Sequence, residues 1–490
     1  MPSSPNSNFA ARLVDRLGEN SRLIEAASGK TLGAADISGL IVGFANYFLS
    51  VGLSPGDRVI LRCGVNPPSA LAYLGAVYAG IVPILLDERT HDFGGLVFER
   101  TKAKAAWSVK PFRWEFPHDI GVRQLDGMCE PCSGGSLEPA SREKDDLAVL
   151  MPTSGSTGVP RFVMVSHGNL IANTDAIIRT QHLGTDERAM LIMPVSYCFG
   201  ASILHTHLYQ GGGVVFDPRF MFPDKVMQAI DHYGCTTFAG VPTVYNILLR
   251  RSNIRTMALS SLRRFLQAGG ALAPESIEEL QSIVPGADFF VMYGQTEATA
   301  RISCLPSGRL KEKLGSAGLP LDNIEVRVVK EDGQEAEERD IGEIQVSGPS
   351  VCSGYLDEPE VTRNKFSDGW LRTGDLGYRD EDGYLWIKGR ISDFVKIRGY
   401  RVALADVEAR VHSVPGVCEC AATAVQHPEA GEALVLFVVK EDVDNNGAPL
   451  IERVKQALPS QWTCASVKVV SELPRTSNGK IARSQLQTLA

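Results

Sequence analysis

The chain repeatedly alternates apolar strand patterns with helical patterns, and this alternation limits the possible folds more than any other feature. Residues 57–64 predict a buried strand, residues 69–80 a helix rich in small packing residues, and residues 81–87 a second strand. The same succession returns over residues 188–217 and again from residue 223 to 284. A strand, a crossover helix and a further strand are typical of parallel pairing. We therefore predict an α/β fold whose large N-terminal domain contains mixed, mainly parallel sheets with helices.

The pattern changes after residue 315. Residues 324–351 alternate apolar and polar side chains around turn signals, which predicts the antiparallel strands of a β-barrel-like subdomain. From Ile391 onward, helix and strand patterns predict a smaller α+β unit. A chain of 490 residues is also too long for one hydrophobic core. We expect domains of residues 1–389 and 390–490, with a boundary near Gly389 to Ser392.

Charge and targeting patterns favour a cytoplasmic enzyme. The formal net charge of -8 argues against nucleic-acid partners, which usually require a basic excess, and no Lys/Arg run suggests a membrane patch. The N-terminal residues do not resemble a signal peptide. No uncharged apolar stretch reaches the roughly 18 residues of a membrane helix. We therefore expect no membrane partner.

The cysteines indicate ordinary reduced thiols. Ten are scattered along the chain, with Cys129 and Cys132 in one close pair and Cys418 and Cys420 in another. Neither pair has a plausible second ligand pair nearby, which argues against zinc. A disulfide framework is rare in a long chain without a secretory signal.

A run of small residues interrupts two apolar strand patterns at Thr153, Ser154, Gly155, Ser156, Thr157 and Gly158. Glycines let backbone N–H groups approach phosphate oxygens, and Ser and Thr hydroxyls add donors. The run lacks the spacing of a Walker loop. Taken alone, it fits either a polyphosphate-binding loop or a flexible turn.

Three further clusters carry polar residues suited to a nucleotide. In YGQTEAT, Tyr293 can stack on a purine, Thr296 can reach a phosphate and Glu297 can hold Mg²⁺, although a polar loop after a strand is an equal alternative. Asp375 in RTGD can accept hydrogen bonds from ribose hydroxyls, or it can be a turn residue. Lys480 in PRTSNGK, taken alone, fits a solvated surface lysine.

Taken in order, these clusters resemble the motifs of the adenylate-forming (ANL) superfamily, which includes acyl-CoA synthetases, adenylation domains and beetle luciferases. Five segments stand at family-like positions: the small-residue loop, YGQTE, RTGD, GRISDFVKIRGYRV and PRTSNGK. A sixth, GEIQVSGPSVCSGYL, matches a lesser motif. The resemblance extends from about residue 30 to 485. It implies that a carboxylate attacks the α-phosphorus of ATP, and that a thiol then displaces AMP from the acyl adenylate. The implied fold is a large ATP- and acid-binding domain followed by a small domain that rotates between the two half-reactions.

The resemblance also implies roles for individual residues. Lys480, Thr296, Glu297 and Lys396 are the candidate catalytic residues, and Glu297 is the candidate Mg²⁺ ligand. Lys480 would act in adenylation, and the loop of Lys396 and Gly399, the candidate thiol tunnel, would replace it for thiol transfer. The candidate ATP-binding residues are Thr153 to Gly158, Arg161, Gly269, Gly270, Ala271, Tyr293, Gly294, Thr296, Asp375, Arg390 and Arg401.

Two positions depart from the family pattern. The family loop continues with Pro-Lys-Gly, whereas this chain has Pro160, Arg161 and Phe162; Arg161 keeps the positive charge and can still bind phosphate oxygens. At the pivot, this chain has Ser392 where the family usually has Asp or Lys. We expect the domain rotation to persist with altered tuning.

The candidate acid pocket comprises Tyr197, Phe199, Gly200 and Gly240. Relatives that activate α-amino acids have an Asp at the position of Gly200, which pairs with the substrate ammonium. Because a buried, unpaired ammonium is costly, this chain favours an aryl acid or a short or medium acyl acid. His205 and His207 fit helix packing better than substrate contact.

We therefore predict an AMP-forming acid–thiol ligase of the acyl-CoA synthetase type that uses ATP, Mg²⁺ and CoA. The alternative is a free-standing adenylation enzyme that loads an aryl or acyl acid onto the phosphopantetheine arm of an acyl carrier protein. A luciferase-like monooxygenase and a non-enzymatic nucleotide-binding relative are the rival classes. The presence of both Lys480 and Glu297 argues against the second rival.

Overall fold

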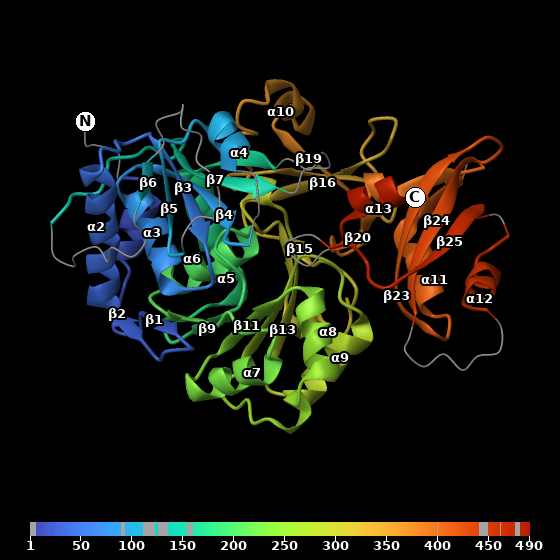
Figure 1. Cartoon of the computed structure of the whole chain (residues 1–490), viewed down its shortest axis with the longest axis horizontal. Coiled ribbons are helices and arrows are strands. Elements are labelled where there is room, and N and C mark those ends of the chain that lie inside the picture. The colour runs from blue at the N-terminus through green and yellow to red at the C-terminus, as the bar shows by residue number, and fades with distance from the viewer. Residues whose placement is uncertain are drawn as a thin grey trace. The chain divides into compact units, whose positions relative to one another are not determined.

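The computed structural model describes residues 6–89, 94–110, 123–125, 136–153, 160–398, 400–440, 449–460, 462–475 and 481–490 (Figure 1). Its elements form two compact units. The first comprises Met1–Arg327, Gln345–Thr373 and Arg379–Trp386. The second comprises Val328–Ile344, Gly374–Tyr378 and Ile387–Ala490. The boundary expected near Gly389 to Ser392 stays a proposal.

A nine-stranded sheet forms one layer of the first unit, in the order β15-β14-β13-β12-β11-β9-β10-β1-β2. Its inner strands, from β13 to β1, pair in parallel, and antiparallel pairs form both ends. The strands are β1 (Arg22–Glu25), β2 (Thr31–Gly33), β9 (Arg188–Leu191), β10 (Gly213–Phe216), β11 (Thr237–Gly240), β12 (Arg264–Gln267), β13 (Asp288–Tyr293), β14 (Ser303–Leu305) and β15 (Leu319–Pro320). The predicted mixed, mainly parallel sheet is confirmed.

A six-stranded sheet has the order β6-β5-β3-β4-β7-β8. All its pairs are parallel except the last, β7 with β8. Its strands are β3 (Arg58–Cys63), β4 (Val82–Asp87), β5 (Ala105–Ser108), β6 (Arg123–Leu125), β7 (Leu147–Thr153) and β8 (Arg161–Ser166). Strand β4 is buried along its whole length, as is typical of parallel strands covered by helices on both faces.

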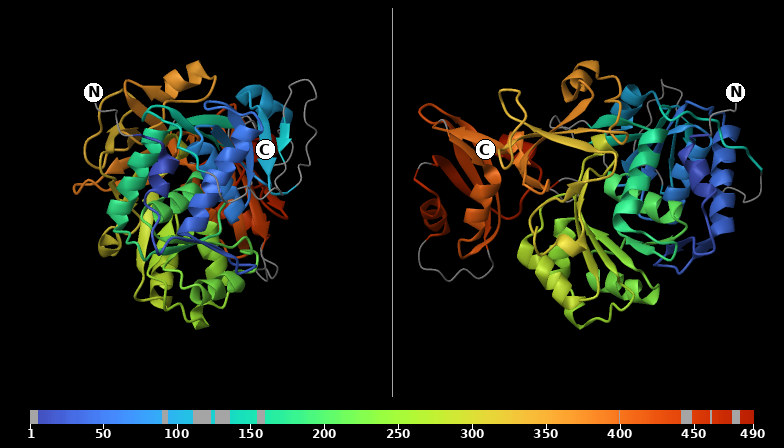
Figure 2. Two further views of the ribbon diagram at one scale, coloured as in Figure 1. Left: turned by 90° about the vertical axis from the view of Figure 1, so that its left-hand side faces the viewer. Right: turned by 180° about the vertical axis from the view of Figure 1, so that it is seen from behind.

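Helices connect these strands at the predicted places. Several of them begin with a proline, among them α7 (Pro223–His232), α8 (Pro242–Arg251) and α9 (Pro274–Ile283). Proline fits the first turn because its missing N–H has no intrahelical partner there. Figures 1 and 2 show α8 and α9 side by side. The other helices of this unit are α1 (Phe9–Val14), α2 (Ala34–Ser50), α3 (Pro67–Tyr78), α4 (Gly94–Thr101), α5 (His167–Gln181), α6 (Cys198–Tyr209) and α10 (Pro359–Lys365).

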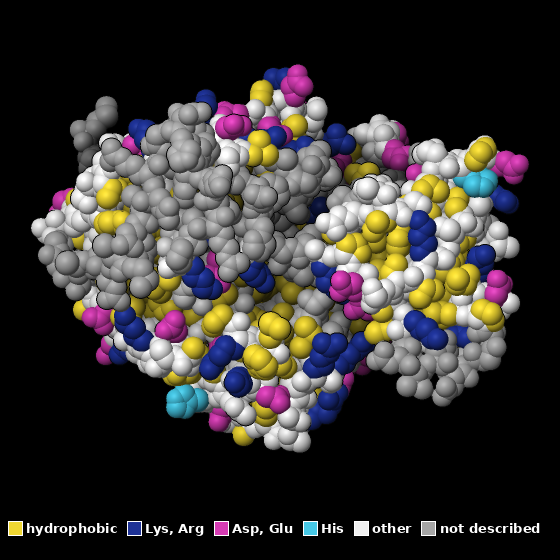
Figure 3. Space-filling model, in the orientation of Figure 1, with side chains coloured by type: hydrophobic (Ala, Val, Ile, Leu, Met, Phe, Trp, Pro, Cys, Tyr) yellow, Lys and Arg dark blue, Asp and Glu magenta, His cyan; other side chains and the backbone are white. Residues whose placement is uncertain are grey.

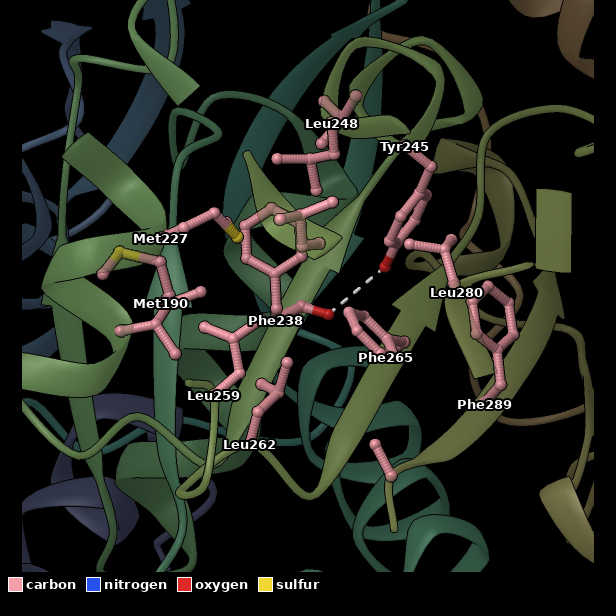
Figure 4. Packing of buried hydrophobic residues seen from close by; sticks show 14 of the residues in the cluster. Met190, Met227, Phe238, Tyr245, Leu248, Leu259, Leu262, Phe265, Leu280 and Phe289 are labelled. Carbon is pink, nitrogen blue, oxygen red and sulfur yellow. Dashed lines mark hydrogen bonds between the residues drawn. The ribbon is translucent and has the colours of Figure 1, made fainter. Parts of the chain in front are cut away.

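An aromatic core fixes α8 on the nine-stranded sheet (Figure 4). Phe238, Phe265 and Phe289 come from three adjacent strands and are fully buried. The buried Tyr245 of α8 donates a hydrogen bond of 2.9 Å to the Leu266 carbonyl and one of 3.3 Å to that of Phe238. Because each buried aromatic side chain stabilises the fold by about 1.5–3 kcal/mol, this cluster holds the strand ends rigidly.

A further set of strands follows residue 320. Strands β16 (Glu325–Val329), β17 (Gly342–Ser347), β19 (Trp370–Arg379) and β18 (Phe366–Ser367) are neighbours in that order, and β20 (Leu385–Arg390) pairs with β19. The pair β18–β19 is antiparallel, and it lies outside the segment 324–351 whose pattern predicts antiparallel strands. Gly318 forms an antiparallel bridge with Leu385.

The second unit contains a sheet with helices on both faces. Strand β24 (Gly431–Lys440) pairs antiparallel with β23 (Val417–His427) and parallel with β25 (Cys464–Val470). Its even-numbered Leu434, Leu436 and Val438 pack with α11 (Leu404–His412) and α12 (Leu450–Ala457). Val435 and Phe437 pack with Leu486 of α13 (Arg483–Leu489). This alternation confirms the predicted α+β organisation.

The surface is mixed in character. On the face drawn in Figure 3, charged side chains of both signs are interspersed with hydrophobic ones over the described residues. Among those residues, no helix combines the length and the apolar composition needed to cross a bilayer.

Candidate functional site

Loops far apart in the sequence meet at one edge of the nine-stranded sheet. Strands β11, β12 and β13 are parallel, and the register places Gly240 beside Gln267 and Gln267 beside Val291. The carboxyl ends of the three strands therefore lie at the same level. Ligands of open α/β sheets bind outside such carboxyl ends. The predicted Gly269–Ala271 segment follows the end of β12, and the predicted Tyr293 and Gly294 are the last residue of β13 and the one after it.

Gly269 brings the predicted adenine side of the site against the predicted acid pocket. Its φ of +88° lies in the left-handed region that favours glycine. A Cβ there would lie 2.8 Å from the Tyr197 hydroxyl oxygen. Gln267 donates a hydrogen bond of 2.7 Å to the Gly270 carbonyl, which fixes the turn. Backbone and phenol are thus in contact where the two predicted subsites meet.

The turn after β13 carries Thr296 and Glu297 in the 3-10 helix η3 (Thr296–Ala298). It folds back tightly, because a Cβ at Gly294 would lie only 1.8 Å from the Ala300 carbonyl oxygen. Glycine is therefore required at that position. The Thr296 hydroxyl lies 3.5 Å from the Cys198 sulfur at the start of α6. The turn thus contacts the acid-pocket helix directly.

Glu297 presents a carboxylate suited to Mg²⁺. It is 9% exposed, and its Oε1 accepts a hydrogen bond of 2.6 Å from the Tyr355 hydroxyl. Its Oε2 has no partner among the described residues. Mg²⁺ prefers carboxylate oxygens and usually takes its remaining ligands from water and substrate phosphates. No group of three or more His, Cys, Asp or Glu residues suited to a metal occurs in the described ranges, so one carboxylate plus phosphates is the donor set that fits.

The small-residue run lies between two strands, as predicted, and the structure pairs them antiparallel. Thr153 ends β7 and lies opposite Arg161, the first residue of β8. The residues predicted to bind phosphates between them, from Ser154 to Gly158, lie outside the described residues. The two strands fix both ends of that loop at the edge of the six-stranded sheet.

Arg161 is engaged by another side chain. Its Nε lies 2.9 Å from Glu358 Oε2, and its guanidinium lies 5.8 Å from the centre of the Tyr355 ring. Arg161, Tyr355 and Glu297 therefore form a continuous series of contacts from the phosphate-loop hairpin to the proposed metal ligand. Glu358 also lies 3.7 Å from Arg100, so it forms ion pairs with two cations.

The second unit brings Asp375 and Arg390 together. Arg390 Nε lies 3.3 Å from Asp375 Oδ1, and the Asp375 side chain is 8% exposed. Lys396 of β21 (Phe394–Ile397) lies opposite Arg401 of β22 (Tyr400–Ala403) in an antiparallel hairpin. Two of the predicted residues, Gly399 and Lys480, lie outside the described part of the chain. The side chains of Ser392, Lys396 and Arg401 lie outside it as well. Their roles stay predictions.

Of the predicted acid-pocket residues, the two aromatic ones lie at the start of α6. The rings of Tyr197 and Phe199 form an edge-to-face pair at 6.3 Å, and burial raises the pKa of the Tyr197 phenol. The other two residues, Gly200 and Gly240, have little room for a Cβ atom. A Cβ at Gly200 would lie 2.4 Å from the Pro194 carbonyl oxygen, and one at Gly240 would lie 2.7 Å from Val244 Cγ1. An Asp at position 200 therefore requires this backbone to move.

The two histidines of α6 pack inside the helix layer. His205 Nε2 lies 3.0 Å from the Tyr73 hydroxyl, and His207 Nδ1 lies 3.0 Å from the Ile203 carbonyl oxygen. Burial lowers the pKa of His205 to about 3 and that of His207 to about 4. Both side chains are therefore neutral at pH 7.

Sequence reasoning missed three residues of this region: Tyr355, Glu358 and Arg301. Tyr355 lies in the motif GEIQVSGPSVCSGYL. That motif indicated that the segment belongs to the family pattern, but it did not indicate the hydrogen bond between the Tyr355 phenol and Glu297. Arg301 places a buried cation beside the ring of Phe199, one of the residues predicted to form an aromatic, apolar pocket. These contacts depend on tertiary structure, so sequence spacing carries no signal for them.

Comparison with known proteins defines the class. A family model described as AMP-binding enzyme matches residues 19–356, and one described as AMP-binding enzyme C-terminal domain matches residues 406–480. Feruloyl-CoA synthase from Amycolatopsis sp is 33% identical over 470 residues, which are 94% of each chain. Sulfoacetate–CoA ligase from Cupriavidus necator is 34% identical over 458 residues, which are 90% of this chain and 89% of the relative.

Solved structures agree with this assignment. ATP-bound MatB from Rhodopseudomonas palustris has a TM-score of 0.88 at 27% identity, with 99% of each chain covered. The o-succinylbenzoate CoA synthetase MenE from Bacillus subtilis, in complex with its acyl-adenylate intermediate, has a TM-score of 0.87 at 26% identity, with 98% of each chain covered.

The chain therefore belongs to the AMP-binding enzyme family, the adenylate-forming superfamily that its motifs resemble. Within that family it is a ligase of the AMP-forming acyl-CoA synthetase type. The predicted family, fold class and enzyme class are confirmed.

Proposed function

We propose that the protein activates a carboxylic acid with ATP and transfers the acyl group to CoA. In the first step, a carboxylate oxygen attacks the α-phosphorus of ATP, and the bond to pyrophosphate breaks. In the second, the CoA sulfur attacks the acyl carbon of the adenylate, and AMP leaves. The thiol proton passes to solvent. The products are an acyl-CoA, AMP and pyrophosphate.

The observation that carries this proposal is the turn of Thr296 and Glu297 at the carboxyl edge of the sheet. Tyr355 holds one carboxylate oxygen of Glu297 and leaves the other available. Thr296 lies against the first residue of the acid-pocket helix. These contacts support a site in which Glu297 holds the metal and the Thr296 hydroxyl faces the acid and the α-phosphate.

Each candidate residue has a proposed role in neutralising or aligning the charged reactants. The attacking carboxylate and the triphosphate are both anionic, so the site must neutralise charge and align the reactants. Mg²⁺ on Glu297 supplies positive charge to the phosphates when it is bound. We propose that the Thr153–Gly158 backbone and hydroxyls hold the β- and γ-phosphates and that Lys480 contacts the carboxylate and α-phosphate. Arg161 is paired with Glu358, so its contribution to phosphate binding requires that pair to open or to share the guanidinium.

The second unit supplies the remaining groups in this proposal. Asp375 and Arg390, which form an ion pair, hold the ribose hydroxyls. A small domain from residue 390 onward presents Lys480 for adenylation, and then the hairpin of Lys396 and Gly399 for thiol transfer. The family's two-step chemistry supports this exchange because one site must serve two different attacking groups. We place the reaction in the cytoplasm, where ATP and CoA are both available.

The acid and the acceptor are the finer parts of the proposal. The names of the relatives refer to ferulate, sulfoacetate and 2-succinylbenzoate, and all three relatives are CoA ligases. An aryl acid or a short or medium acyl acid remains the proposed substrate, with CoA as acceptor. The three named relatives give no comparable support for loading of a carrier protein.

A pyrophosphate-release screen tests the function. The purified chain with ATP and Mg²⁺ is given a panel of carboxylic acids, each without acceptor, with CoA and with a phosphopantetheinylated carrier protein. We expect acid-dependent pyrophosphate release and stoichiometric AMP and acyl-CoA in the CoA arm. Acyl transfer only to the carrier protein would overturn the choice of acceptor, and ADP in place of AMP would overturn the mechanism.

A further inference from the structure

Arg301 is a buried arginine beside the candidate site, and it has no anionic partner among the described residues. It follows the Thr296–Glu297 turn, and its side chain is among the largest that are fully buried, at 2% exposure. Its Nε and Nη1 atoms are buried without a hydrogen-bond partner. No carboxylate in the described part of the chain pairs with it. A guanidinium in this condition needs a physical explanation.

The side chain lies against the start of α6, where the acid pocket is predicted. The Arg301 guanidinium carbon lies 5.1 Å from the centre of the Phe199 ring. Its charge also acts on the Tyr197 phenol and the Cys304 thiol, whose pKa values it lowers against the larger effect of burial. The Tyr197 hydroxyl forms no hydrogen bond with any described residue. The Arg301 guanidinium and the Tyr197 phenol therefore both lie beside the Phe199 ring.

The backbone of Arg301 is fixed, so the side chain cannot easily leave. Asn173 of α5 accepts a hydrogen bond of 3.3 Å from the Arg301 N–H and donates one of 2.8 Å to its carbonyl oxygen. Asn173 is itself buried. Because the backbone is fixed and the side chain is fully buried, the guanidinium has little room to move before any ligand arrives, as expected of a preorganised binding group.

The charge persists at neutral pH. Burial lowers the pKa of the Arg301 guanidinium to about 10, which leaves it protonated at pH 7. Removing an ion from water without a partner is strongly unfavourable, and contact with an aromatic face offsets only part of that penalty. A bound anion is the group that compensates the remainder.

We propose that Arg301 binds a second anionic group of the acid substrate, remote from the carboxylate that is adenylated. The preferred substrates are thus compact dianionic acids, such as dicarboxylates or sulfocarboxylates, whose planar or tripodal oxygens match the guanidinium fork. This inference rests on the proposed function, because it assigns the distal end of the same acid. Phe199 and Tyr197 form the walls that position that distal group.

Paired substrates test the assignment in the wild-type protein. Each dianionic acid is compared with its monoamide, which keeps the shape and removes one charge: succinate with succinamate, and isophthalate with 3-carbamoylbenzoate. We expect kcat/KM for pyrophosphate release to favour one dianion over its amide by about 100-fold, as a charged hydrogen-bonded pair implies. Equal use of both members, or preference for the amides, would overturn the proposal.

Variants test the residue. Arg301→Met is expected to lose about 100-fold in kcat/KM for the dianion, to change less than about 3-fold for the amide, and to keep the wild-type KM for ATP. Arg301→Lys is expected to retain an intermediate preference, because it keeps the charge but not the fork. An equal loss for both acids in the two variants would assign Arg301 to the fold instead. A thermal unfolding measurement identifies any variant that does not fold, and the wild-type comparison does not depend on it.

Failure of this inference is distinguishable from failure of the proposed function. Pyrophosphate release with monoanionic acids alone contradicts the role of Arg301 and leaves the ligase function intact. Absence of release with every acid contradicts the function. In that case calorimetric binding of succinate against succinamate still decides the inference, and equal affinities would overturn it.

Discussion

The Tyr355 hydroxyl donates a 2.6 Å hydrogen bond to Glu297 Oε1 and joins segments 58 residues apart. Burial and the neighbouring carboxylate raise the pKa of the phenol, so it stays protonated and remains a donor throughout the neutral range. The bond fixes which oxygen of Glu297 faces the protein. It thereby selects the other oxygen for a cation, and it connects the metal ligand to Arg161 through the Tyr355 ring.

Replacement of this phenol by Phe tests its positioning role. We expect Tyr355→Phe to raise the Mg²⁺ concentration for half-maximal pyrophosphate exchange and to lower the rate by about 10-fold, since a hydrogen bond to a charged group contributes about 1.5–3 kcal/mol. A Mg²⁺ titration at saturating ATP measures this. Tyr233→Phe removes a hydroxyl whose 3.4 Å bond to the Ala26 carbonyl is remote from the site, and it is the matched control. An unchanged Mg²⁺ dependence would contradict the role of Tyr355.

Close packing at Gly200 predicts instability rather than a new specificity. Because a Cβ would lie 2.4 Å from the Pro194 carbonyl oxygen, we expect Gly200→Ala to destabilise the fold by about 1–3 kcal/mol. Thermal unfolding measures the change. Gly286→Ala is the control, since nothing lies within 4 Å of its Cβ position. A Gly200→Asp protein that gained exchange with an α-amino acid at wild-type stability would contradict this expectation.

Much of the architecture was predictable because it depends on local pattern. Alternating strand and helix patterns predict β3, α3 and β4. The small packing residues of α3 fit a helix that is buried along its length. The proline starts of α7, α8 and α9 follow from the missing N–H of proline. The assembly of strands into two sheets was not specified, because residues 22–25 pair with residues 213–216 across almost two hundred positions.

The site was predictable only as far as its motifs extend. Thr296 and Glu297 were found because a family motif contains them. Tyr355, Glu358 and Arg301 were not, because their importance lies in contacts with residues distant in sequence: an oxygen of Glu297, the guanidinium of Arg161 and the ring of Phe199. Arg301 also shows why composition misleads, since the charge beside a segment that reads as aromatic and apolar comes from the loop before β14.

Buried histidines predict a loss of stability in mild acid. Burial lowers the pKa of His167, His205 and His207 from 6.5 to between about 3 and about 4, while the unfolded chain keeps the ordinary value. As the pH falls below about 6.5, only the unfolded state takes up protons, so the free energy of unfolding decreases, by up to about 1.4 kcal/mol per pH unit for each histidine. Arg142 and Asp146 act on His167, and Tyr73 contacts His205.

Thermal unfolding between pH 7 and pH 5 checks this dependence. We expect His207→Gln to show a shallower decrease than the wild type, whereas His412→Gln, at an exposed position, should follow the wild type. A midpoint independent of pH across this window would contradict the assignment of neutral, buried histidines.

Separate loss of the two half-reactions is the sharpest prediction for the second unit. We expect Lys480→Ala to lower pyrophosphate exchange by about 10²–10³-fold, because it removes a donor at the developing charge, while ATP binding largely persists. The same variant should still convert a synthetic acyl adenylate and CoA to acyl-CoA. Lys396→Ala should show the opposite pattern, with exchange retained and thioester formation reduced. Lys440→Ala, at the exposed end of β24, is the control for loss of a lysine charge. Equal losses of both half-reactions in the two variants would contradict the exchange of lysines, since one fixed arrangement of the small domain would then serve both steps.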